Sequence, residues 1–445
     1  MSTTHDTPTG TRDTTGQHHV AARRRVGSVH ARLAEGGQAL PVRLWDGTRL
    51  GPHGAPYTIV LRHPWSLRAM LWPGTDLAVG EAYLDDVFDV EGSMVAALRD
   101  VARLGLDGLT WPARIALGTD VLRLPRPPTG GERGGVAPGG RRAHSPERDR
   151  QVVQHHYDVG NDFYRLFLDD GLVYSCGYLH PDDDAPPGVA ADAALDRAQQ
   201  RKLELVCRKL GLRPGMRLLD VGCGWGALVL HAAEHHGVEA VGITLAEQQA
   251  ALARERAAER GLADRVEVRV ADYREVEGTF DAIASVGMVE HVGAGMLPTY
   301  FERLRGLLRP AGRLLNHGIT TGRRQQVRDL AAADDSFVGR YVFPDGALVP
   351  SSHVVARAEE AGFEVLDLQQ LRPHYARTLE HWVHRLERRA EAARELAGER
   401  RYRTWRAYMA GSVVGFESGD LGVVQLLCQR DGRPPLHRDW LHAER

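Results

Sequence analysis

The stretch Arg217-Leu-Leu-Asp-Val-Gly-Cys-Gly-Trp-Gly226 decides the fold that we expect for this chain. Its apolar run predicts a strand with Asp220 near the end. A tight turn follows at Gly222, Gly224 and Gly226, and apolar residues of helical spacing come next. Glycine lets the backbone approach a ligand, and the first turn of a helix points free N–H groups at the same place. The stretch therefore predicts a strand, a turn and a helix that bind a nucleotide-like ligand.

The composition excludes several classes of protein. The chain has 445 residues, enough for two domains, and a formal net charge of -2, which gives no bias towards nucleic acid. Only Lys202 and Lys209 of its 56 basic residues are lysine. The chain has no apolar run of about 18 residues and no signal-peptide pattern at its start, so we expect a cytoplasmic protein that is peripheral to a membrane at most.

The cysteines carry no metal-binding pattern. They are scattered along the chain, at Cys176, Cys207, Cys223 and Cys428. This spacing favours a reducing cytosol and predicts neither a disulfide framework nor a metal site.

The chain before residue 151 divides into three parts by composition. Residues 1–22 have almost no apolar content, which predicts a disordered tail. Residues 23–124 predict a small α+β domain without catalytic groups, and we expect it to associate with lipid. Residues 125–150 are rich in Pro, Gly and Arg, which is typical of a linker. The expected elements of the small domain are strands at 40–45 and 57–62 and helices at 64–72 and 93–104.

Residues 151–445 alternate strands with helices, which predicts an α/β domain with a doubly wound, Rossmann-like parallel sheet. The expected strands are Arg217–Val221, Ala240–Leu245, Val266–Ala271, Phe280–Val286 and Arg313–Ile319. Further strands are expected at 363–371 and 423–429, with a helix at 195–210 and charged helical stretches from 377 to 406. In such sheets the ligand lies beyond the carboxyl ends of the strands.

The glycine spacing favours one cofactor. Dinucleotide sites use G-x-G-x-x-G with an acid about 20 residues later. Here the spacing is Gly-x-Gly-x-Gly, Asp220 precedes it, and the second strand ends in Gly242-Ile-Thr-Leu245 without an acid. This combination resembles the S-adenosylmethionine-dependent methyltransferases. Asp272 follows the third strand, where that superfamily contacts adenine; the alternative is that Asp272 only caps a helix.

Six further motifs narrow the resemblance. They are His156-Tyr-Asp-Val-Gly-Asn-Asp-Phe-Tyr164, Tyr174-Ser-Cys176, Gly242-Ile-Thr-Leu-Ala-Glu-Gln-Gln249, Ser285-Val-Gly-Met-Val-Glu-His-Val-Gly293, His317-Gly-Ile319 and Tyr341-Val-Phe-Pro-Asp-Gly346. Together they resemble the cyclopropane-fatty-acyl-phospholipid synthase family, which includes mycolic acid cyclopropane synthases and mid-chain fatty acyl methyltransferases. The resemblance covers residues 151–430. It implies an enzyme that uses S-adenosylmethionine and bicarbonate on unsaturated phospholipid acyl chains, at the inner face of the membrane, with a homodimer left open.

The resemblance also implies the site residues. The cofactor would be held by Tyr174, Ser175, Asp220, Gly222, Gly224, Gly226, Thr244, Gln249, Asp272, Tyr273 and Arg274. The catalytic group around bicarbonate would be Cys176, Glu290, His317, the backbone of Ile319, and Tyr375. Tyrosine, imidazole and backbone N–H groups donate to anions, while a carboxylate can orient the bicarbonate hydroxyl. The ring faces of Tyr157 and Tyr174 would stabilise a cation.

Three of the catalytic residues also have an ordinary structural interpretation. Taken alone, Cys176 is typical of a small buried apolar residue, His317 of a core histidine, and Tyr375 of a half-buried aromatic residue. Ser412 stands where some family members have a cysteine once proposed as a nucleophile, so a thiol mechanism there is excluded.

Alternatives remain open for the product of the reaction and for the functional class of the protein. The same base serves ring closure to a cyclopropane and formation of a methylene- or methyl-branched chain. A lipid-binding protein without catalysis and a small-molecule methyltransferase are further hypotheses.

Overall fold

The computed structural model describes residues 14–35, 39–104, 111–128, 148, 160–183, 192–323, 328–329 and 336–441. The start of the expected tail, most of the expected linker, and residues 151–159 with Tyr157 lie outside these ranges. The chain forms two compact units, residues 1–132 and 133–445.

The first unit contains a four-stranded sheet in the order β2-β1-β3-β4. Its strands are β1 (Val42–Arg43), β2 (Arg49–Leu50), β3 (Tyr57–Leu61) and β4 (Phe88–Gly92), and its helices are α1 (Thr14–Glu35), α2 (Ser66–Leu71), α3 (Asp76–Leu84), α4 (Met94–Arg103) and α5 (Trp111–Leu122). The expected strand at 57–62 and both expected helices are present. Ser93 caps α4 by accepting a hydrogen bond from the N–H of Ala96 at 3.2 Å.

Helix α1 corrects one expectation. It begins at Thr14, so a helix replaces the disorder expected for residues 14–22. Ala22, Val26 and Val29 lie on one face and are at most 2% exposed, which gives the helix an apolar stripe to bury. The opposing contact is polar as well: Ser28 donates to Asp120 of α5 at 3.1 Å.

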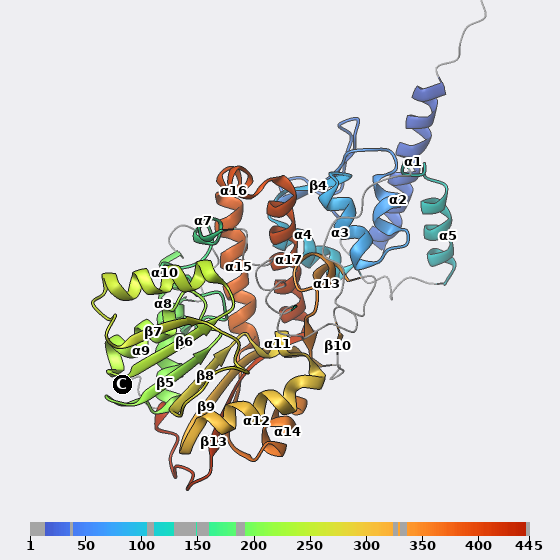
Figure 1. The fold of residues 1–445 in the computed structure, drawn as a ribbon. Helices are drawn as coiled ribbons and strands as arrows, with labels where there is room; N and C mark the ends of the chain where they lie inside the picture. Colours follow the sequence, from blue (N-terminus) through green and yellow to red (C-terminus); the bar gives the residue numbers. More distant parts are fainter. Residues whose placement is uncertain are drawn as a thin grey trace, which may run out of the picture. The chain divides into compact units, whose positions relative to one another are not determined.

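The second unit is built on a seven-stranded sheet in the order β12-β13-β9-β8-β5-β6-β7 (Figure 1). The strands are β5 (Arg217–Val221), β6 (Glu239–Thr244), β7 (Val266–Val270), β8 (Phe280–Val286), β9 (Leu308–Thr321), β12 (Phe363–Gln370) and β13 (Leu421–Arg430). Neighbours from β7 to β9 pair in parallel, as expected. Strand β13 runs antiparallel to both β9 and β12, which the sequence pattern did not indicate.

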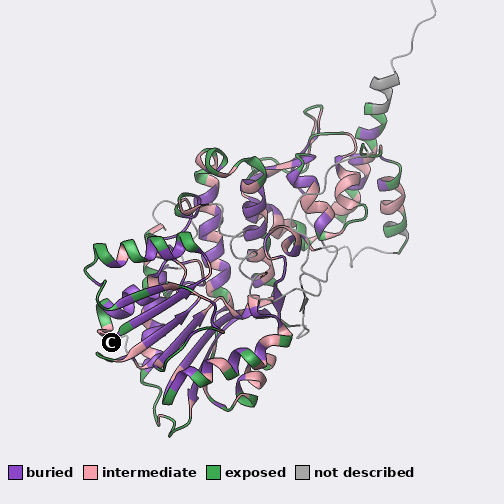
Figure 2. Cartoon of the chain, viewed as in Figure 1, coloured by how far each residue is buried: buried purple, intermediate pink, exposed green. Residues whose placement is uncertain are grey.

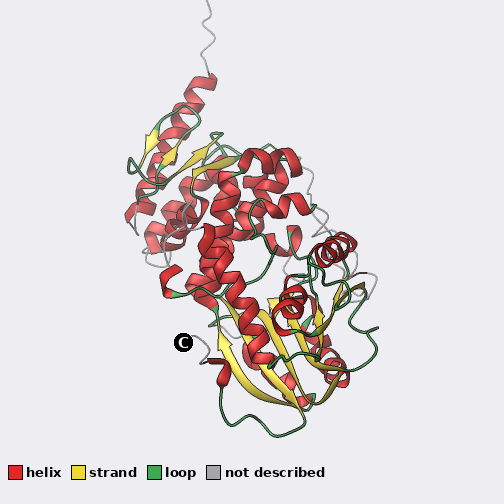
Figure 3. Cartoon of the chain, turned by 90° about the vertical axis from the view of Figure 1, so that its left-hand side faces the viewer, coloured by secondary structure: helices red, strands yellow, loops and turns green. Residues whose placement is uncertain are grey.

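Helices cover both faces of this sheet: Figure 2 shows that the strands are largely buried, and Figure 3 shows the strands and helices from a second side. Helices α8 (Asp192–Leu210), α9 (Ala227–His236) and α10 (Glu247–Glu259) share an apolar core with one face, to which Leu218 belongs. Helices α11 (Val289–Val292), α12 (Leu297–Leu307) and α14 (Ser351–Glu360) pack with the other face, to which Leu219 belongs. Successive residues of β5 therefore point to opposite layers, as strand geometry requires.

The expected charged stretch from 377 to 406 forms parts of three helices, α15 (Arg372–Arg388), α16 (Ala390–Ala397) and α17 (Glu399–Ser418). Helices α15 and α17 pack against each other (Figure 1). Trp382 and Phe416 are at most 1% exposed, so both helices contribute to the core. None of the described helices is long and apolar enough to cross a bilayer.

Candidate active site

The turn after β5 has the backbone that its glycines predict. The φ angles are +83° at Gly222, +53° at Gly224 and +84° at Gly226. A Cβ atom on Gly222 would lie 2.7 Å from Met288, whereas one on Gly224 would meet no atom of the described residues within 4 Å. The space in front of Gly224 is where a ligand can approach the backbone.

A cavity lies at this turn, beyond the carboxyl ends of β5, β6 and β8. The expected cofactor residues that line it are Tyr174, Ser175, Asp220, Gly222, Gly224, Thr244, Gln249, Asp272, Tyr273 and Arg274. Gly226 does not line the cavity. A Cβ there would lie 2.9 Å from that of Ala253, so close packing of α9 against α10 requires this glycine.

Asp220 brings a buried acid to the cavity. Its Oδ1 has no hydrogen-bond partner among the described residues, and the residue is 2% exposed. Burial raises the pKa of Asp220 to about 7, and the nearby Lys202 limits this shift. An unpartnered buried acceptor is costly, so the position is suited to a ligand that donates hydrogen bonds.

The other polar lining residues are held by short contacts. Thr244 donates from Oγ1 to Oε1 of Gln249 at 2.8 Å. Asp272 accepts from the backbone N–H of Arg274 at 2.9 Å and from its guanidinium at 2.6 Å and 2.8 Å. Asp272 thus stabilises its own turn, which is close to the capping alternative, and it also lines the cavity.

Glu290 and Ile319 meet at the carboxyl end of β9. The backbone N–H of Ile319 donates to Oε1 of Glu290 at 2.7 Å, and Oε2 has no partner among the described residues. Burial raises the pKa of Glu290 to about 7. The N–H that the resemblance assigned to an anion is therefore bonded to the acid instead.

His317 lies two residues earlier on β9, with its ring fixed by Gln425 of β13. Nε2 of Gln425 lies 3.1 Å from Nδ1 of His317, and Nε2 of His317 has no partner in the described chain. Burial and the charge of Lys202 lower the pKa of His317 to about 3, so the imidazole is neutral. With Gln425 donating to Nδ1, the ring proton resides on the unpartnered Nε2.

Cys176 and Tyr375 come together through the start of α15. Sγ of Cys176 lies 3.2 Å from the carbonyl of Gly177 and 3.8 Å from that of Leu371, which immediately precedes α15. Burial raises the pKa of the Cys176 thiol, so it is un-ionised. Tyr375, in the first turns of α15, packs its ring edge-on to Trp382 with centroids 6.1 Å apart.

None of the catalytic candidates lines the cavity, but chain neighbours of two of them, Cys176 and Glu290, do. Ser175 adjoins Cys176, and Met288 lies two residues before Glu290; both line the cavity. The ring of Tyr174 stacks on Trp382 at 5.2 Å, which places an aromatic face next to the same segment. The two expected groups of residues are thus neighbours along the chain at Cys176 and at Glu290.

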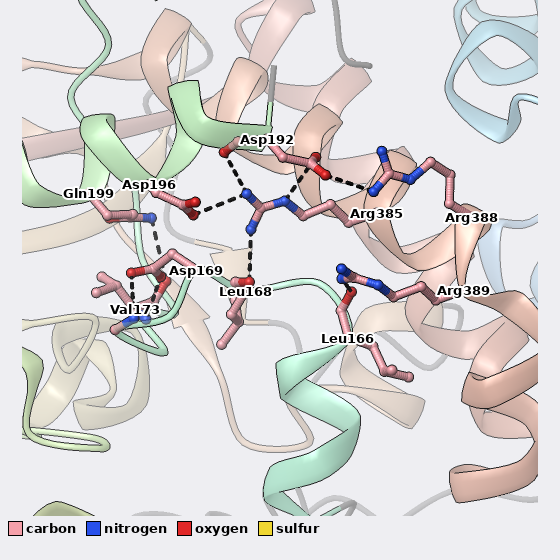
Figure 4. A network of polar contacts seen from close by, with 11 residues as sticks. Leu166, Leu168, Asp169, Val173, Asp192, Asp196, Gln199, Arg385, Arg388 and Arg389 are labelled. Carbon is pink, nitrogen blue, oxygen red and sulfur yellow. Dashed lines mark hydrogen bonds and ion pairs between the residues drawn. The ribbon is translucent and has the colours of Figure 1, made fainter. Parts of the chain in front are cut away.

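A polar network holds the segment that leads to Tyr174 (Figure 4). Arg385 of α15 donates to the carbonyl of Leu168 at 2.8 Å and pairs with Asp192 at 3.2 Å. Asp169 accepts from the N–H of Val173 at 2.8 Å. These bonds fix the path of the chain between α7 (Asn161–Arg165) and the cavity.

Comparisons with known proteins assign the chain and its fold to a family. Residues 144–426 match the family model described as mycolic acid cyclopropane synthetase. The chain belongs to this family. A probable fatty acid methyltransferase of Pseudomonas putida is 38% identical over 392 residues, which cover 87% of this chain and 91% of the relative.

Two further family members sharpen the assignment. The cyclopropane-fatty-acyl-phospholipid synthase of Escherichia coli is 32% identical, covering 84% of this chain and 88% of its own. The solved mycolic acid cyclopropane synthase CmaA1, complexed with SAH (S-adenosylhomocysteine) and CTAB, matches with a TM-score of 0.57 and 34% identity, covering 63% of this chain and 98% of its own. The protein is therefore an S-adenosylmethionine-dependent methyltransferase with the class I fold.

This member of the cyclopropane synthetase family has site residues that sequence reasoning missed. Gln425 lies 3.1 Å from the ring of His317, and Lys202 lines the cavity. The only signal for Lys202 in the sequence was that lysine is so rare in the chain. Ser412 donates to the carbonyl of Tyr408 at 2.8 Å within α17, an ordinary helical contact.

The structure also gathers Cys207, His231 and His236, whose possible ligand atoms lie within 4.8 Å of one another. Sequence spacing did not indicate this group. Glu204 already bonds the Nε2 atoms of the two imidazoles, at 3.2 Å and 3.0 Å, which accounts for both histidines without an ion.

Proposed function

We propose that this enzyme adds a carbon from S-adenosylmethionine across the cis double bond of an unsaturated phospholipid acyl chain, forming a cyclopropane, with bicarbonate as the base. The observation that carries the proposal is a pair of buried atoms without a hydrogen-bond partner among the described residues, Oε2 of Glu290 and Nε2 of His317. One is an acceptor and the other a donor, and each side chain is fixed by a bond to its other polar atom. Bicarbonate offers the complementary donor and acceptor.

The residues of the chain fit both groups. The open space before Gly224 and the unpartnered Oδ1 of Asp220 suit the cofactor. When bound, S-adenosylmethionine supplies an electrophilic methyl group and bicarbonate supplies a base for a proton of that methyl group. His317 would donate to an oxygen of the anion, and ionised Glu290 would accept the hydrogen bond of its hydroxyl.

The remaining residues favour an alkene substrate. An alkene is a weak nucleophile, so the double bond and the methyl group of the cofactor must be held close together, correctly oriented and away from water. The faces of Tyr174, Trp382 and Tyr375 form an aromatic group that can stabilise positive charge on the acyl chain. We propose that the enzyme reaches this substrate as a peripheral protein at the inner face of the membrane.

One alternative keeps the same site and changes the product. A hydride shift before loss of a proton from the added methyl group gives a methylene-branched chain, and a saturated methyl branch needs a hydride donor in addition. A relative described as a probable fatty acid methyltransferase supports this alternative. A lipid-binding protein without catalysis has no need of Glu290 and His317 in this arrangement. A small-molecule methyltransferase is disfavoured because it does not require a buried acid and a buried imidazole held in this way.

The experiment is turnover of dioleoyl phosphatidylglycerol vesicles by the full chain with S-adenosylmethionine, with and without added bicarbonate in carbon dioxide-free buffer. We expect acyl chains that gain one CH₂ unit, resist ozone and depend on bicarbonate. A product that ozone cleaves at an added methylene would select the branched alternative. Turnover that ignores bicarbonate would exclude the proposed base.

A further inference from the structure

Both lysines of this arginine-rich chain are buried, at 3% exposure for Lys202 and 0% for Lys209. Lys209 is paired with an anion: its Nζ lies 3.5 Å from Oδ2 of Asp367, and also 2.7 Å from Oε1 of Gln369. Lys202 has neither a carboxylate within 4 Å nor any hydrogen-bond partner except Oγ of Ser175, at 2.9 Å, among the described residues. A buried ammonium without a paired anion is costly to the fold.

Lys202 lies where a bound ligand can supply the missing anion. It lines the cofactor cavity, and Ser175 lines it too. Gln199, one turn earlier on α8, donates to the carbonyl of Ser175 at 2.9 Å. Helix α8 is therefore hydrogen-bonded to both the carbonyl and the hydroxyl of Ser175, through Gln199 and Lys202. These two bonds fix the position of the Lys202 ammonium relative to the cavity wall.

Asp220 supplies the opposite charge in the same cavity. The two groups act on each other: burial lowers the pKa of Lys202 to about 8, an effect that Asp169 and Asp220 oppose, and Lys202 restrains the rise of the Asp220 pKa. They nevertheless form no ion pair within 4 Å. Two opposite charges thus line one cavity with a gap between them.

We propose that Lys202, together with the hydroxyl of Ser175, binds the carboxylate of the methionine part of the cofactor, while Asp220 binds its ammonium group. The proposal rests on the placement of the cofactor in this cavity. An ammonium has three N–H donors, and Ser175 takes one, so two are left for a carboxylate. The zwitterionic end of the cofactor then fills the gap and pairs both buried charges.

The arrangement predicts a specific selectivity. A ligand that keeps the adenosine part but lacks the amino-acid end cannot pair either charge. A ligand that keeps the ammonium and lacks only the carboxylate can pair Asp220 but leaves Lys202 without an anion. Lys202 should therefore discriminate between ligands that differ by one carboxylate.

The test is calorimetry on the full chain with three ligands: SAH, its decarboxylated analogue, and 5′-methylthioadenosine. Lys202→Met keeps the length and apolar stem of the side chain and removes the charge. We expect this variant to bind SAH roughly 10–100-fold more weakly, whereas its affinity for the two ligands without a carboxylate stays within about threefold of wild type. Lys209→Met, the matched control, should bind all three ligands as the wild type does.

Three results would overturn the proposal. Equal losses for all three ligands would show that Lys202 only shapes the cavity, and an unchanged affinity for SAH would show that it has no role. If Lys202→Met fails to fold, the wild type decides alone, because equal affinity for SAH and its decarboxylated analogue excludes a carboxylate site. Failure of the cofactor placement looks different: Gly224→Val would then leave SAH binding intact.

Discussion

The backbone N–H of Ile319 donates to Oε1 of Glu290 at 2.7 Å, so the strand that carries His317 also fixes the acid. One carboxylate oxygen is thereby bonded to the backbone, and the other has no hydrogen-bond partner among the described residues. The relationship explains why a glycine separates His317 from Ile319. A Cβ on Gly318 would lie 2.1 Å from Val289, the residue before Glu290, so only glycine lets α11 approach β9 this closely.

Glu290→Gln keeps the volume of the side chain and an oxygen that can accept from the N–H of Ile319. The second carboxylate oxygen becomes an NH₂ donor, and the negative charge is lost. We expect turnover to fall by about 10²–10³, typical of the loss of one well-placed polar contact in a dry site, with the affinity for SAH unchanged. Steady-state kinetics and calorimetry measure the two quantities. Glu267→Gln, an exposed glutamate on β7, is the control. Full activity of Glu290→Gln would remove Glu290 from the mechanism.

Gln425 is a positioning residue, because it acts through His317. Gln425→Leu removes the bond to Nδ1 and frees the imidazole to change tautomer, so fewer molecules present a proton on Nε2. We expect the bicarbonate concentration for half-maximal rate to rise roughly tenfold, with recovery at high bicarbonate, since a loss of about 1.4 kcal/mol in anion binding is tenfold. A fall in rate that no bicarbonate concentration restores would contradict this role.

The sequence predicted the parallel part of the sheet well because its strands are continuous apolar runs that end at glycines or turns. The strands β5 and β8 have the expected bounds, and β6 and β7 differ by one residue. Strand β9 is longer than expected at both ends, since Leu308 pairs with Phe280 beyond a register shift. Direction was not predictable for β13, because apolar periodicity is the same in parallel and antiparallel strands.

The site was less predictable where it depends on pairing distant segments. The bond between His317 and Gln425 joins residues 108 apart, on strands whose pairing the pattern did not reveal. Gly226 belonged to the glycine motif, yet its role is packing against Ala253. Lys202 looked like one charge on a polar helix, and only the folded position on α8 shows that it is buried at the cavity.

Gly224→Val tests the cofactor placement. The residue has φ +53° and open space at its Cβ position, so valine adds both backbone strain and a side chain in the cavity. Gly261→Val is a matched control, because Gly261 has φ +67° and equally open space but lies at the exposed end of α10. We expect SAH binding to be lost in the first variant and kept in the second, with similar losses of thermal stability. Calorimetry and thermal unfolding report both effects.

The first unit can be tested by removing it. The solved relative CmaA1 covers 63% of this chain in 98% of its own length, so a methyltransferase unit of this family folds alone. A chain that begins at Ser145 keeps the ion pair of Arg148 with Asp345 at 2.6 Å. We expect it to bind SAH normally and to turn over detergent-dispersed substrate as the full chain does. Its turnover of vesicles should be roughly tenfold lower, as for a loss of about 1.4 kcal/mol of membrane affinity. Equal rates on vesicles would contradict a lipid-associated role.

Asp220→Asn should raise the stability of the ligand-free protein and weaken its stabilisation by SAH. The pKa of Asp220 is about 7 in the folded protein and 3.8 in its ordinary state. The folded protein therefore keeps a proton that the unfolded chain releases, and the stability contributed by Asp220 is complete below pH 3.8 and lost as the pH rises through 7. The cost at pH 8 is at most about 4 kcal/mol. Asparagine does not titrate, so the variant should gain stability over the wild type between pH 5 and pH 8.

Thermal unfolding across this pH range measures the gain in stability of the variant. At pH 8, added SAH should reverse the difference in stability between the variant and the wild type. The ligand's ammonium pairs the ionised Asp220 of the wild type, whereas the Asp220→Asn variant lacks that charge and should be stabilised less by the same concentration of SAH. A wild type and variant whose stabilities differ by a constant amount from pH 5 to pH 8 would show that Asp220 is ionised throughout. Its Oδ1, which has no partner among the described residues, would then be stabilised by solvent and would not need the cofactor.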